Sequence, residues 1–260
     1  MLEKIETFER FSPTIMQFKV SDRFVNIVNT TGDAVLPDDG LSKKFDFSDS
    51  LVGKVSKEVR IPILDEDDKE YYKSTLKDGC LEYLKTMIEK KRAYEWTKGG
   101  GSNEPTRDNI HLAQSWIVSQ YKHEYNPWHT HSGHFSGVIY LKIPENMSKQ
   151  YDEEFKDHYP ASGLIEFMYG EKADFRSDNL KFKPEVGTML IFPSWLKHSV
   201  APFYGPGERR TLSANFRVPF SANAKDESSG DLHFKNMFDR DSKTQPEPEV
   251  TADTPMSDIL

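Results

Sequence analysis

Apolar residues recur every four positions in the segment 65–92. Leu76, Cys80, Leu84 and Ile88 form one stripe along it, and this spacing is typical of an α-helix with one buried face. Acidic residues at the beginning of the segment and basic residues at its end complement the helix dipole. We therefore expect a helix that packs against a sheet and plays a structural role.

The pattern changes to short apolar or alternating runs beyond Ser115. Such runs, separated by turn residues, are typical of the strands of an antiparallel sandwich or barrel. The sequence therefore predicts a mainly β core with flanking helices. The expected strands are Ser115–Tyr121, Ser136–Ile143, Leu164–Tyr169, Thr188–Phe192 and Arg209–Val218.

Two further strand-like runs precede the helix. Met16–Val20 and Phe24–Val28 are rich in apolar and β-branched residues, and turn residues follow at Thr31–Asp33 and Pro37–Gly40. We expect two short strands followed by turns. The glycines of Gly99–Ser102 predict a flexible loop after the helix.

Composition and charge narrow the class of protein. The chain has 260 residues, enough for one large domain with extensions, and its net charge of −8 argues against broad binding to nucleic acid. Cys80 is the single cysteine, so no intrachain disulfide can form; we expect it to be a small buried residue in a reducing compartment. No segment reaches the roughly 18 apolar residues of a membrane span, and the N-terminus shows no signal segment. We therefore expect a cytoplasmic protein without a membrane partner.

Four of the eight histidines crowd into the stretch His123–His134. His129 and His131 are two positions apart, which on a strand places both imidazoles on the same face. Two neutral imidazoles on one face are a natural pair of ligands for iron, zinc or copper. We expect His123 and His134 to be surface or loop residues instead.

A third ligand must come from elsewhere in the chain. The candidate is His198, which follows an apolar strand and a proline turn and begins the next strand. Neighbouring antiparallel strands of a barrel can bring it to the first pair. Trp128 and Trp195, which lie near these histidines in the sequence, are expected in the core or the pocket wall.

An anion site is predicted by the last strand. Its odd-numbered positions from Arg209 to Asn215 are polar, whereas the even-numbered positions after Arg210 are apolar. On a strand the polar set shares one face, and an inward arginine binds a carboxylate through two parallel hydrogen bonds. The residues alone therefore indicate a barrel interior that holds a metal and an anionic ligand.

The order and spacing of these motifs resemble those of iron(II)- and 2-oxoglutarate-dependent oxygenases, in particular prolyl-hydroxylase-like members with a His-x-His motif. The resemblance covers residues 115–220. It implies that His129, His131 and His198 bind Fe(II) and form the catalytic centre. His131 stands where the family usually has a carboxylate, so the alternatives are a three-histidine site and a carboxylate from elsewhere, such as Glu124.

The same resemblance implies a set of residues that bind the co-substrate, 2-oxoglutarate. Tyr140 stands on the strand after the first motif, and Arg209 with Thr211 matches the family's arginine on the last core strand. The spacing from His198 favours Arg209 over Arg210. A dry wall around the site is expected from the apolar strand residues Val138, Ile165, Leu190 and Phe192.

The resemblance also implies a double-stranded β-helix, the jelly-roll or cupin-like fold. We divide the chain accordingly into an N-terminal extension with strands and a buttressing helix (1–110), the catalytic core (111–222) and a C-terminal extension (223–260). The last part has the composition of a disordered tail.

The function implied is hydroxylation of an unidentified substrate, peptidyl proline or a small metabolite, with release of succinate and CO2. One alternative is a cupin-type metal-dependent dioxygenase or isomerase without 2-oxoglutarate, because Gly187, Pro193 and His198 also fit a cupin motif. Another is a non-catalytic barrel, since zinc also accepts three histidines. A homodimer is left open by the sequence.

Overall fold

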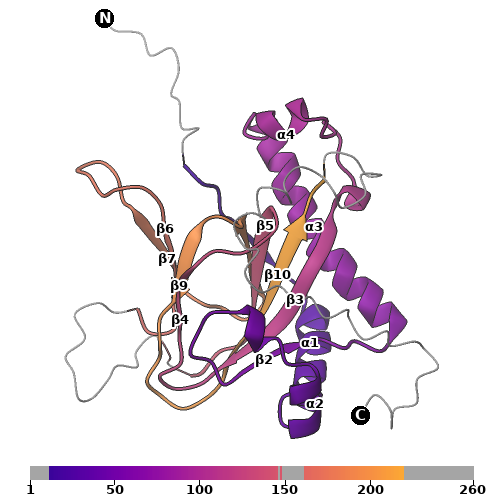
Figure 1. The fold of residues 1–260 in the computed structure, drawn as a ribbon, viewed down its shortest axis with the longest axis vertical. Helices are drawn as coiled ribbons and strands as arrows, with labels where there is room; N and C mark the ends of the chain where they lie inside the picture. The colour runs from indigo at the N-terminus through magenta and orange to yellow at the C-terminus, as the bar shows by residue number, and fades with distance from the viewer. Residues whose placement is uncertain (1–11, 146, 148–160, 220–260) are drawn as a thin grey trace, which may run out of the picture.

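The computed structural model describes residues 12–145, 147 and 161–219, and its centre is a pair of antiparallel sheets (Figure 1). The six-stranded sheet has the order β1-β8-β5-β10-β3-β2, and the four-stranded sheet has the order β4-β9-β6-β7. The strands are β1 (Met16–Lys19), β2 (Lys57–Arg60), β3 (His111–Gln120), β4 (Asn126–His129), β5 (Phe135–Lys142), β6 (Ile165–Met168), β7 (Asn179–Phe182), β8 (Thr188–Pro193), β9 (Lys197–Val200) and β10 (Arg209–Arg217).

The eight strands from β3 to β10 cross repeatedly between the two sheets. β3, β5, β8 and β10 lie in the larger sheet, and β4, β6, β7 and β9 form the smaller one. This connectivity is that of a double-stranded β-helix. It confirms the predicted fold class and all five strands predicted beyond Ser115.

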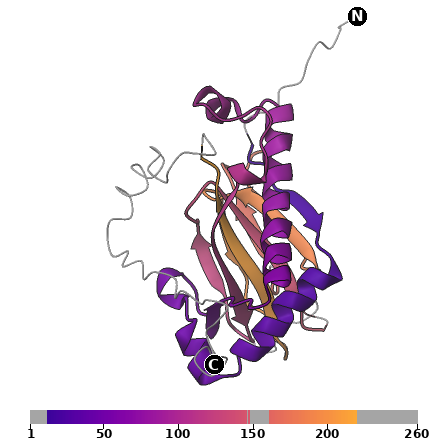
Figure 2. The ribbon, with the colours of Figure 1, turned by 90° about the vertical axis from the view of Figure 1, so that its right-hand side faces the viewer.

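Helices cover the outer face of the larger sheet (Figure 2). The predicted long helix is confirmed as α3, and its stripe residues Leu76, Cys80 and Leu84 are buried. Asp65 caps α3 by accepting a hydrogen bond from the Asp68 N–H. The helices are α1 (Asp22–Val35), α2 (Asp39–Lys44), α3 (Glu66–Glu89) and α4 (Tyr94–Lys98), with short 3-10 turns η1 (Ser48–Ser50) and η2 (Arg107–Asn109).

The strand predicted at Phe24–Val28 is wrong, because these residues belong to α1. Phe24, Val25 and Val28 are buried at helical spacing, and the Ser21 hydroxyl caps the helix by accepting from the Phe24 N–H. A short apolar run does not distinguish the two structures by itself. β1 over Met16–Lys19, in contrast, is confirmed.

The turns predicted after that run are also wrong. Gly32 lies inside α1, and a Cβ there would approach both an Arg210 nitrogen and Ile117 to 2.9 Å. This glycine therefore permits close packing of the helix on the sheet. Asp38 caps α2, so the predicted turn at Pro37–Gly40 is the beginning of a helix.

Two apolar clusters show which face of each strand is turned toward the interior of the barrel. One lies between the helices and the larger sheet and takes the even-numbered residues of β10, such as Leu212 and Phe216. The other includes residues from both sheets and contains the four predicted wall residues Val138, Ile165, Leu190 and Phe192. The odd-numbered face of β10 is thereby turned toward the space between the sheets.

Some sequence-based expectations fall outside the described residues. They include the segment 223–260, for which the sequence predicts a C-terminal extension with a disordered tail. Among the described helices, none is long and apolar enough to cross a membrane.

Candidate functional site

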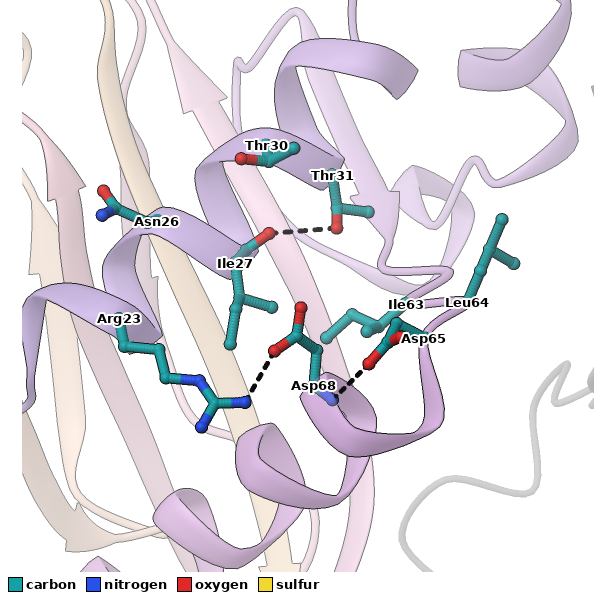
Figure 3. Close-up of a pocket in the computed structure, with 9 residues that line it drawn as sticks. All are labelled: Arg23, Asn26, Ile27, Thr30, Thr31, Ile63, Leu64, Asp65 and Asp68. Atoms are coloured by element: carbon teal, nitrogen blue, oxygen red, sulfur yellow. Dashed lines mark hydrogen bonds and ion pairs between the residues drawn. The ribbon is translucent and has the colours of Figure 1, made fainter.

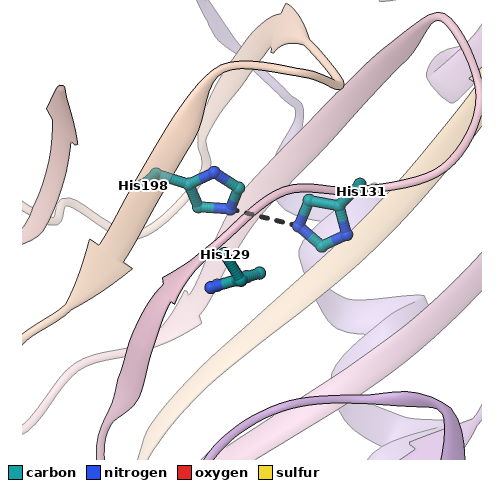
Figure 4. A group of neighbouring side chains, drawn as sticks. All are labelled: His129, His131 and His198. Carbon is teal, nitrogen blue, oxygen red and sulfur yellow. Dashed lines mark hydrogen bonds between the residues drawn. The ribbon is translucent and has the colours of Figure 1, made fainter. Parts of the chain in front are cut away.

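Three histidines meet where β4 and β9 pair (Figure 4). His129 ends β4 opposite His198 of β9, and His131 follows β4 in the adjoining loop. One ligand nitrogen from each lies within 4.8 Å of the others. The Nε2 atoms of His131 and His198 are 3.1 Å apart, close to the about 3 Å expected for two imidazole nitrogens at a right angle around one metal.

The backbone fixes the tautomers of two of these imidazoles. His129 Nδ1 lies 2.6 Å from the Pro127 carbonyl oxygen, and His198 Nδ1 lies 2.9 Å from that of Leu196. A carbonyl only accepts, so each Nδ1 carries a proton and donates it. Each Nε2 therefore keeps its lone pair for a metal, the arrangement that second-sphere contacts produce in metal sites.

Burial keeps the three imidazoles neutral. It lowers the pKa of His198 to about 3 and also lowers the pKa of His129. The pKa of His131 lies well below its ordinary value, mainly because of burial and to a smaller extent because of the nearby His198 and His129. Neutral imidazole is the form that binds metal, so this donor set suits a borderline cation such as Fe(II) or zinc.

Glu124, the alternative carboxylate, lies elsewhere. Its two oxygens accept hydrogen bonds from the Ser56 hydroxyl and the Tyr121 N–H. Within the described part of the chain, the three histidines form the one cluster suited to a metal. The geometry therefore favours the three-histidine alternative.

Arg209 lies in the wall of the same pocket. Its guanidinium donates to the Gly163 carbonyl oxygen (3.1 Å) and to Gln120 Oε1 (2.7 Å), and the residue is 1% exposed. Its remaining terminal nitrogen and the Tyr140 hydroxyl are both buried; they lie close enough to interact with each other, but neither makes a well-formed hydrogen bond to a described residue. The guanidinium carbon lies 5.3 Å from the centre of the Tyr140 ring.

These two unpaired groups fit a bound carboxylate. A buried donor without a partner is costly, and a carboxylate would accept from the guanidinium and the phenol together. Thr211 lines the same pocket of about 470 Å³, as do all three histidines. The site therefore offers donors for a carboxylate ligand.

Arg210 lies on the opposite face of β10. It pairs with Glu208 (2.6 Å) and Asp33 (2.9 Å) on the helical side of the sheet. The alternation predicted for this strand places Arg209, Thr211, Ser213 and Asn215 in the pocket. Arg209 is therefore the arginine available to an anion in the barrel.

Two residues that the sequence did not reveal hold Arg209 in place. Gln120 of β3 accepts from Arg209 and donates to Asn126 Oδ1 (3.1 Å), and Asn126 donates to the Val52 carbonyl oxygen (3.0 Å). Gln120 is fully buried. Nothing in the sequence around Gln120 or Asn126 indicates this role. It becomes clear only from the pairing of Gln120 with Arg209 across β3 and β10.

Glu58 of β2 is a second residue of the pocket wall that the sequence did not reveal. It is 5% exposed, and burial, together with the nearby Asp46 and Glu124 carboxylates, raises its pKa to about 7. The alternation Lys57-Glu58-Val59-Arg60 was its only sequence signal. It became informative once β2 was found paired with β3.

Glu58→Gln is expected to stabilise the protein more at pH 8 than at pH 5. The folded state holds the Glu58 proton up to about pH 7, whereas the unfolded chain releases it near pH 4.3. Stability is therefore lost as the pH rises between these values, by at most about 4 kcal/mol. Urea unfolding of both proteins at the two pH values measures the difference, and an equal difference at both would contradict the burial of an ionisable Glu58.

The two tryptophans near the histidines do not lie in the core, contrary to expectation. Trp128 is 44% exposed and Trp195 is 53% exposed. Trp128 lies on β4, where its neighbour His129 contributes to the metal cluster, so the alternation of a strand turns it away. The tryptophan in the pocket wall is instead Trp116 of β3, which is buried and contacts the His131 ring at 5.8 Å.

A second hollow, of about 560 Å³, lies between α1 and the beginning of α3 (Figure 3). Its charged side chains are already engaged, since Arg23 pairs with Asp68 at 2.9 Å and the Asp68 N–H donates to Asp65. Neither a histidine nor a cysteine lines it. It offers no chemistry comparable to that of the barrel pocket.

One family model matches the segment that contains this site. Residues 114–215 match the model of the family described as "Putative 2OG-Fe(II) oxygenase". None of the curated proteins searched matches the chain.

Similar solved structures include a prolyl-4-hydroxylase from Pseudomonas putida, with 13% identity over 79% of this chain and 92% of that one and a TM-score of 0.44. A prolyl hydroxylase from Trichoplax adhaerens, in complex with a peptide fragment of the hypoxia inducible factor oxygen degradation domain, shares 13% identity over 78% and 83% of the chains, with a TM-score of 0.46. AviO1 from Streptomyces viridochromogenes shares 14% identity over 81% and 93%, with a TM-score of 0.46.

The family match covers the segment that contains the three histidines, Tyr140, Arg209 and Thr211. It confirms the resemblance predicted from the sequence. Residues 114–215 are thus similar to the 2OG-Fe(II) oxygenase family, and this similarity implies Fe(II) and 2-oxoglutarate as metal and co-substrate.

Proposed function

We propose that the protein is a 2-oxoglutarate-dependent dioxygenase that hydroxylates its substrate, with release of succinate and CO2. The supporting observation is that one pocket is lined by both the histidine cluster and Arg209, whose remaining terminal nitrogen is buried close to the Tyr140 ring. A cupin-type enzyme without 2-oxoglutarate has no need of an arginine buried in this way.

In the proposed mechanism, His129, His131 and His198 would hold Fe(II) through neutral imidazoles. With Fe(II) and 2-oxoglutarate bound, dioxygen would be the oxidant: one of its oxygen atoms goes to the substrate C–H bond to form the hydroxyl group, and the other goes to 2-oxoglutarate, which leaves as succinate and CO2. Arg209 binds the far carboxylate of 2-oxoglutarate, assisted by the Tyr140 hydroxyl and by Thr211. Gln120 and the Gly163 carbonyl orient the guanidinium before the co-substrate arrives, which lowers the cost of ordering it on binding.

The apolar wall has a separate task in this mechanism. Val138, Ile165 and Phe192 line the pocket between the histidines and the two sheets. They exclude water from the site, which strengthens the attraction between Arg209 and a carboxylate. For the wider setting, we propose a cytoplasmic enzyme whose substrate is peptidyl proline or a small metabolite.

Anaerobic titration of the apo-protein with Fe(II) and 2-oxoglutarate tests this proposal. We expect a visible charge-transfer absorption band that requires both additions, because a keto acid chelated to Fe(II) absorbs where neither component does. Succinate, which lacks the keto group, is the matched control and should give no band. Succinate formation under air then measures turnover without a substrate.

Other outcomes of the titration favour the alternative functions. Iron binding without a band at any 2-oxoglutarate concentration would support a cupin-type enzyme. Binding of zinc but not of Fe(II) would support a non-catalytic barrel.

A further inference from the structure

Glu58 is a buried carboxylate without a positive partner. It lines the pocket that contains the histidines and is 5% exposed. Its carboxylate makes neither a hydrogen bond nor an ion pair with any residue that the structure describes. Buried carboxyl groups normally have a hydrogen-bond partner or a positive partner, so one left without either in a pocket wall points to a ligand.

The charged groups around Glu58 define the sign of that ligand. The carboxyl groups of Asp46 and Glu124 act on Glu58 and add negative potential around it. Arg60 is two positions along β2, but its guanidinium lies over the Phe47 ring at 5.0 Å. A positive group that enters the pocket would therefore relieve repulsion as well as pair with Glu58.

An aromatic wall connects Glu58 with the metal site. Trp116 contacts the His131 ring at 5.8 Å and the Phe47 ring at 5.2 Å, and both Trp116 and Phe47 line the pocket. Aromatic faces attract ammonium and guanidinium groups, more strongly where water is excluded. The Trp116 and Phe47 rings also offer an apolar surface to the carbon skeleton of a substrate bound beside the histidines.

The strand register separates the acidic and basic ends of the pocket. Thr211 of β10 pairs with Val118 of β3, which pairs with Glu58 of β2. Glu58 and Thr211 are therefore two strand spacings apart, about 10 Å between Cα atoms. The carboxylate-binding end at Arg209 and the carboxylate at Glu58 are thus distinct positions in one cavity.

We propose that the substrate is an organic cation, whose ammonium or guanidinium group binds between Glu58 and the aromatic wall of Trp116 and Phe47. The inference rests on the proposed oxygenase function, since it names the substrate class of that site. It favours an amine-bearing metabolite or a basic side chain over an uncharged prolyl residue. The opposite charges of the two ends keep the anionic co-substrate and the cationic substrate in separate places.

Anaerobic calorimetry on the full chain with Fe(II) and 2-oxoglutarate tests this inference. Choline and its uncharged isostere 3,3-dimethylbutan-1-ol form a matched pair of probes. We expect choline to bind at least 10-fold more tightly than the alcohol, and we expect Glu58→Gln to remove that preference. n-Butylamine and the methylamide of Nα-acetyl-lysine, as further probes, distinguish a free amine from a peptide side chain.

Asp46→Asn is the matched control variant. Asp46 is an exposed neighbour whose oxygens accept from the Ser48 hydroxyl and N–H, so the preference for choline should change less than 3-fold. Near-ultraviolet circular dichroism checks that Glu58→Gln is folded, and Glu58→Asp, which keeps the charge on a shorter side chain, should retain part of the preference. Equal binding of choline and the alcohol by the wild type, or a preference that survives in folded Glu58→Gln, would overturn the inference.

The proposed function fails separately. It is tested by the absorption band of the wild type, which does not depend on the probes. A wild type that gives the band but does not prefer the cation leaves the oxygenase intact and removes the substrate class. A wild type that prefers the cation but gives no band keeps the cation site and removes the proposed oxygenase function.

Discussion

His198→Ala is expected to lower the affinity for Fe(II) by more than about 100-fold, because changes in the second sphere of a metal site already cost 10- to 100-fold. His198 is 3% exposed, its Nδ1 proton is committed to the Leu196 carbonyl, and its Nε2 faces that of His131. Alanine removes this nitrogen and leaves two ligands. Anaerobic metal titration followed by equilibrium dialysis measures the loss, and succinate formation should fall below detection.

His123→Asn is the matched control for that variant. His123 has a positive φ of 68°, which asparagine tolerates, and its side chain is exposed beside Tyr204. Iron affinity and turnover should stay within about 2-fold of the wild type. If His198→Ala bound iron as tightly as His123→Asn, the three histidines would not be the metal site.

Arg209→Gln is expected to raise the dissociation constant for 2-oxoglutarate by about 100-fold or more. Removing one partner of a buried, hydrogen-bonded charge pair costs about 2–5 kcal/mol. Fe(II) affinity without 2-oxoglutarate should change little, because Arg209 is not part of the histidine cluster. The 2-oxoglutarate concentration that gives half of the anaerobic absorption band measures the effect.

Arg210→Gln separates the pocket from the scaffold. The two arginines are adjacent on β10, but Arg210 pairs with Glu208 and Asp33 on the helical side. Its replacement should lower the free energy of unfolding and leave the dissociation constant for 2-oxoglutarate nearly unchanged. If Arg210→Gln weakened 2-oxoglutarate binding more than Arg209→Gln, the co-substrate would bind on the helical face of β10 and the proposed pocket would be wrong.

The parts of the fold that sequence could predict are those specified by local periodicity. The apolar stripe of α3 spans several helical turns, and the segments of β5, β8 and β10 are long enough to show the pattern of a strand. Each pattern therefore predicts the correct type of secondary structure. Phe24–Val28 does not, because four apolar residues in a run of five fit a strand as well as one face of α1. Gly32 was misinterpreted as a turn because its reason, the close approach of Arg210 and Ile117, comes from distant parts of the chain.

The candidate site divides in the same way. His129, His131, His198 and Arg209 stand in motifs with recognisable spacing, so the sequence proposed them. Glu58 and Gln120 acquire their positions through pairing of β2 and β10 with β3. Polar residues on strands are common, and only tertiary pairing shows which ones line a cavity.

The edge strand β2 has a consequence for how such enzymes diversify. The histidines and Arg209 lie within the segment 114–215 that matches the oxygenase family, whereas Phe47, Val52 and Glu58 lie before it and still line the pocket. Mutations in this short preceding stretch can alter the pocket wall while the histidine cluster stays unchanged. Replacement of the edge strand β2 and the loop before it would thus change which molecules the pocket accepts, without any change in the histidine cluster.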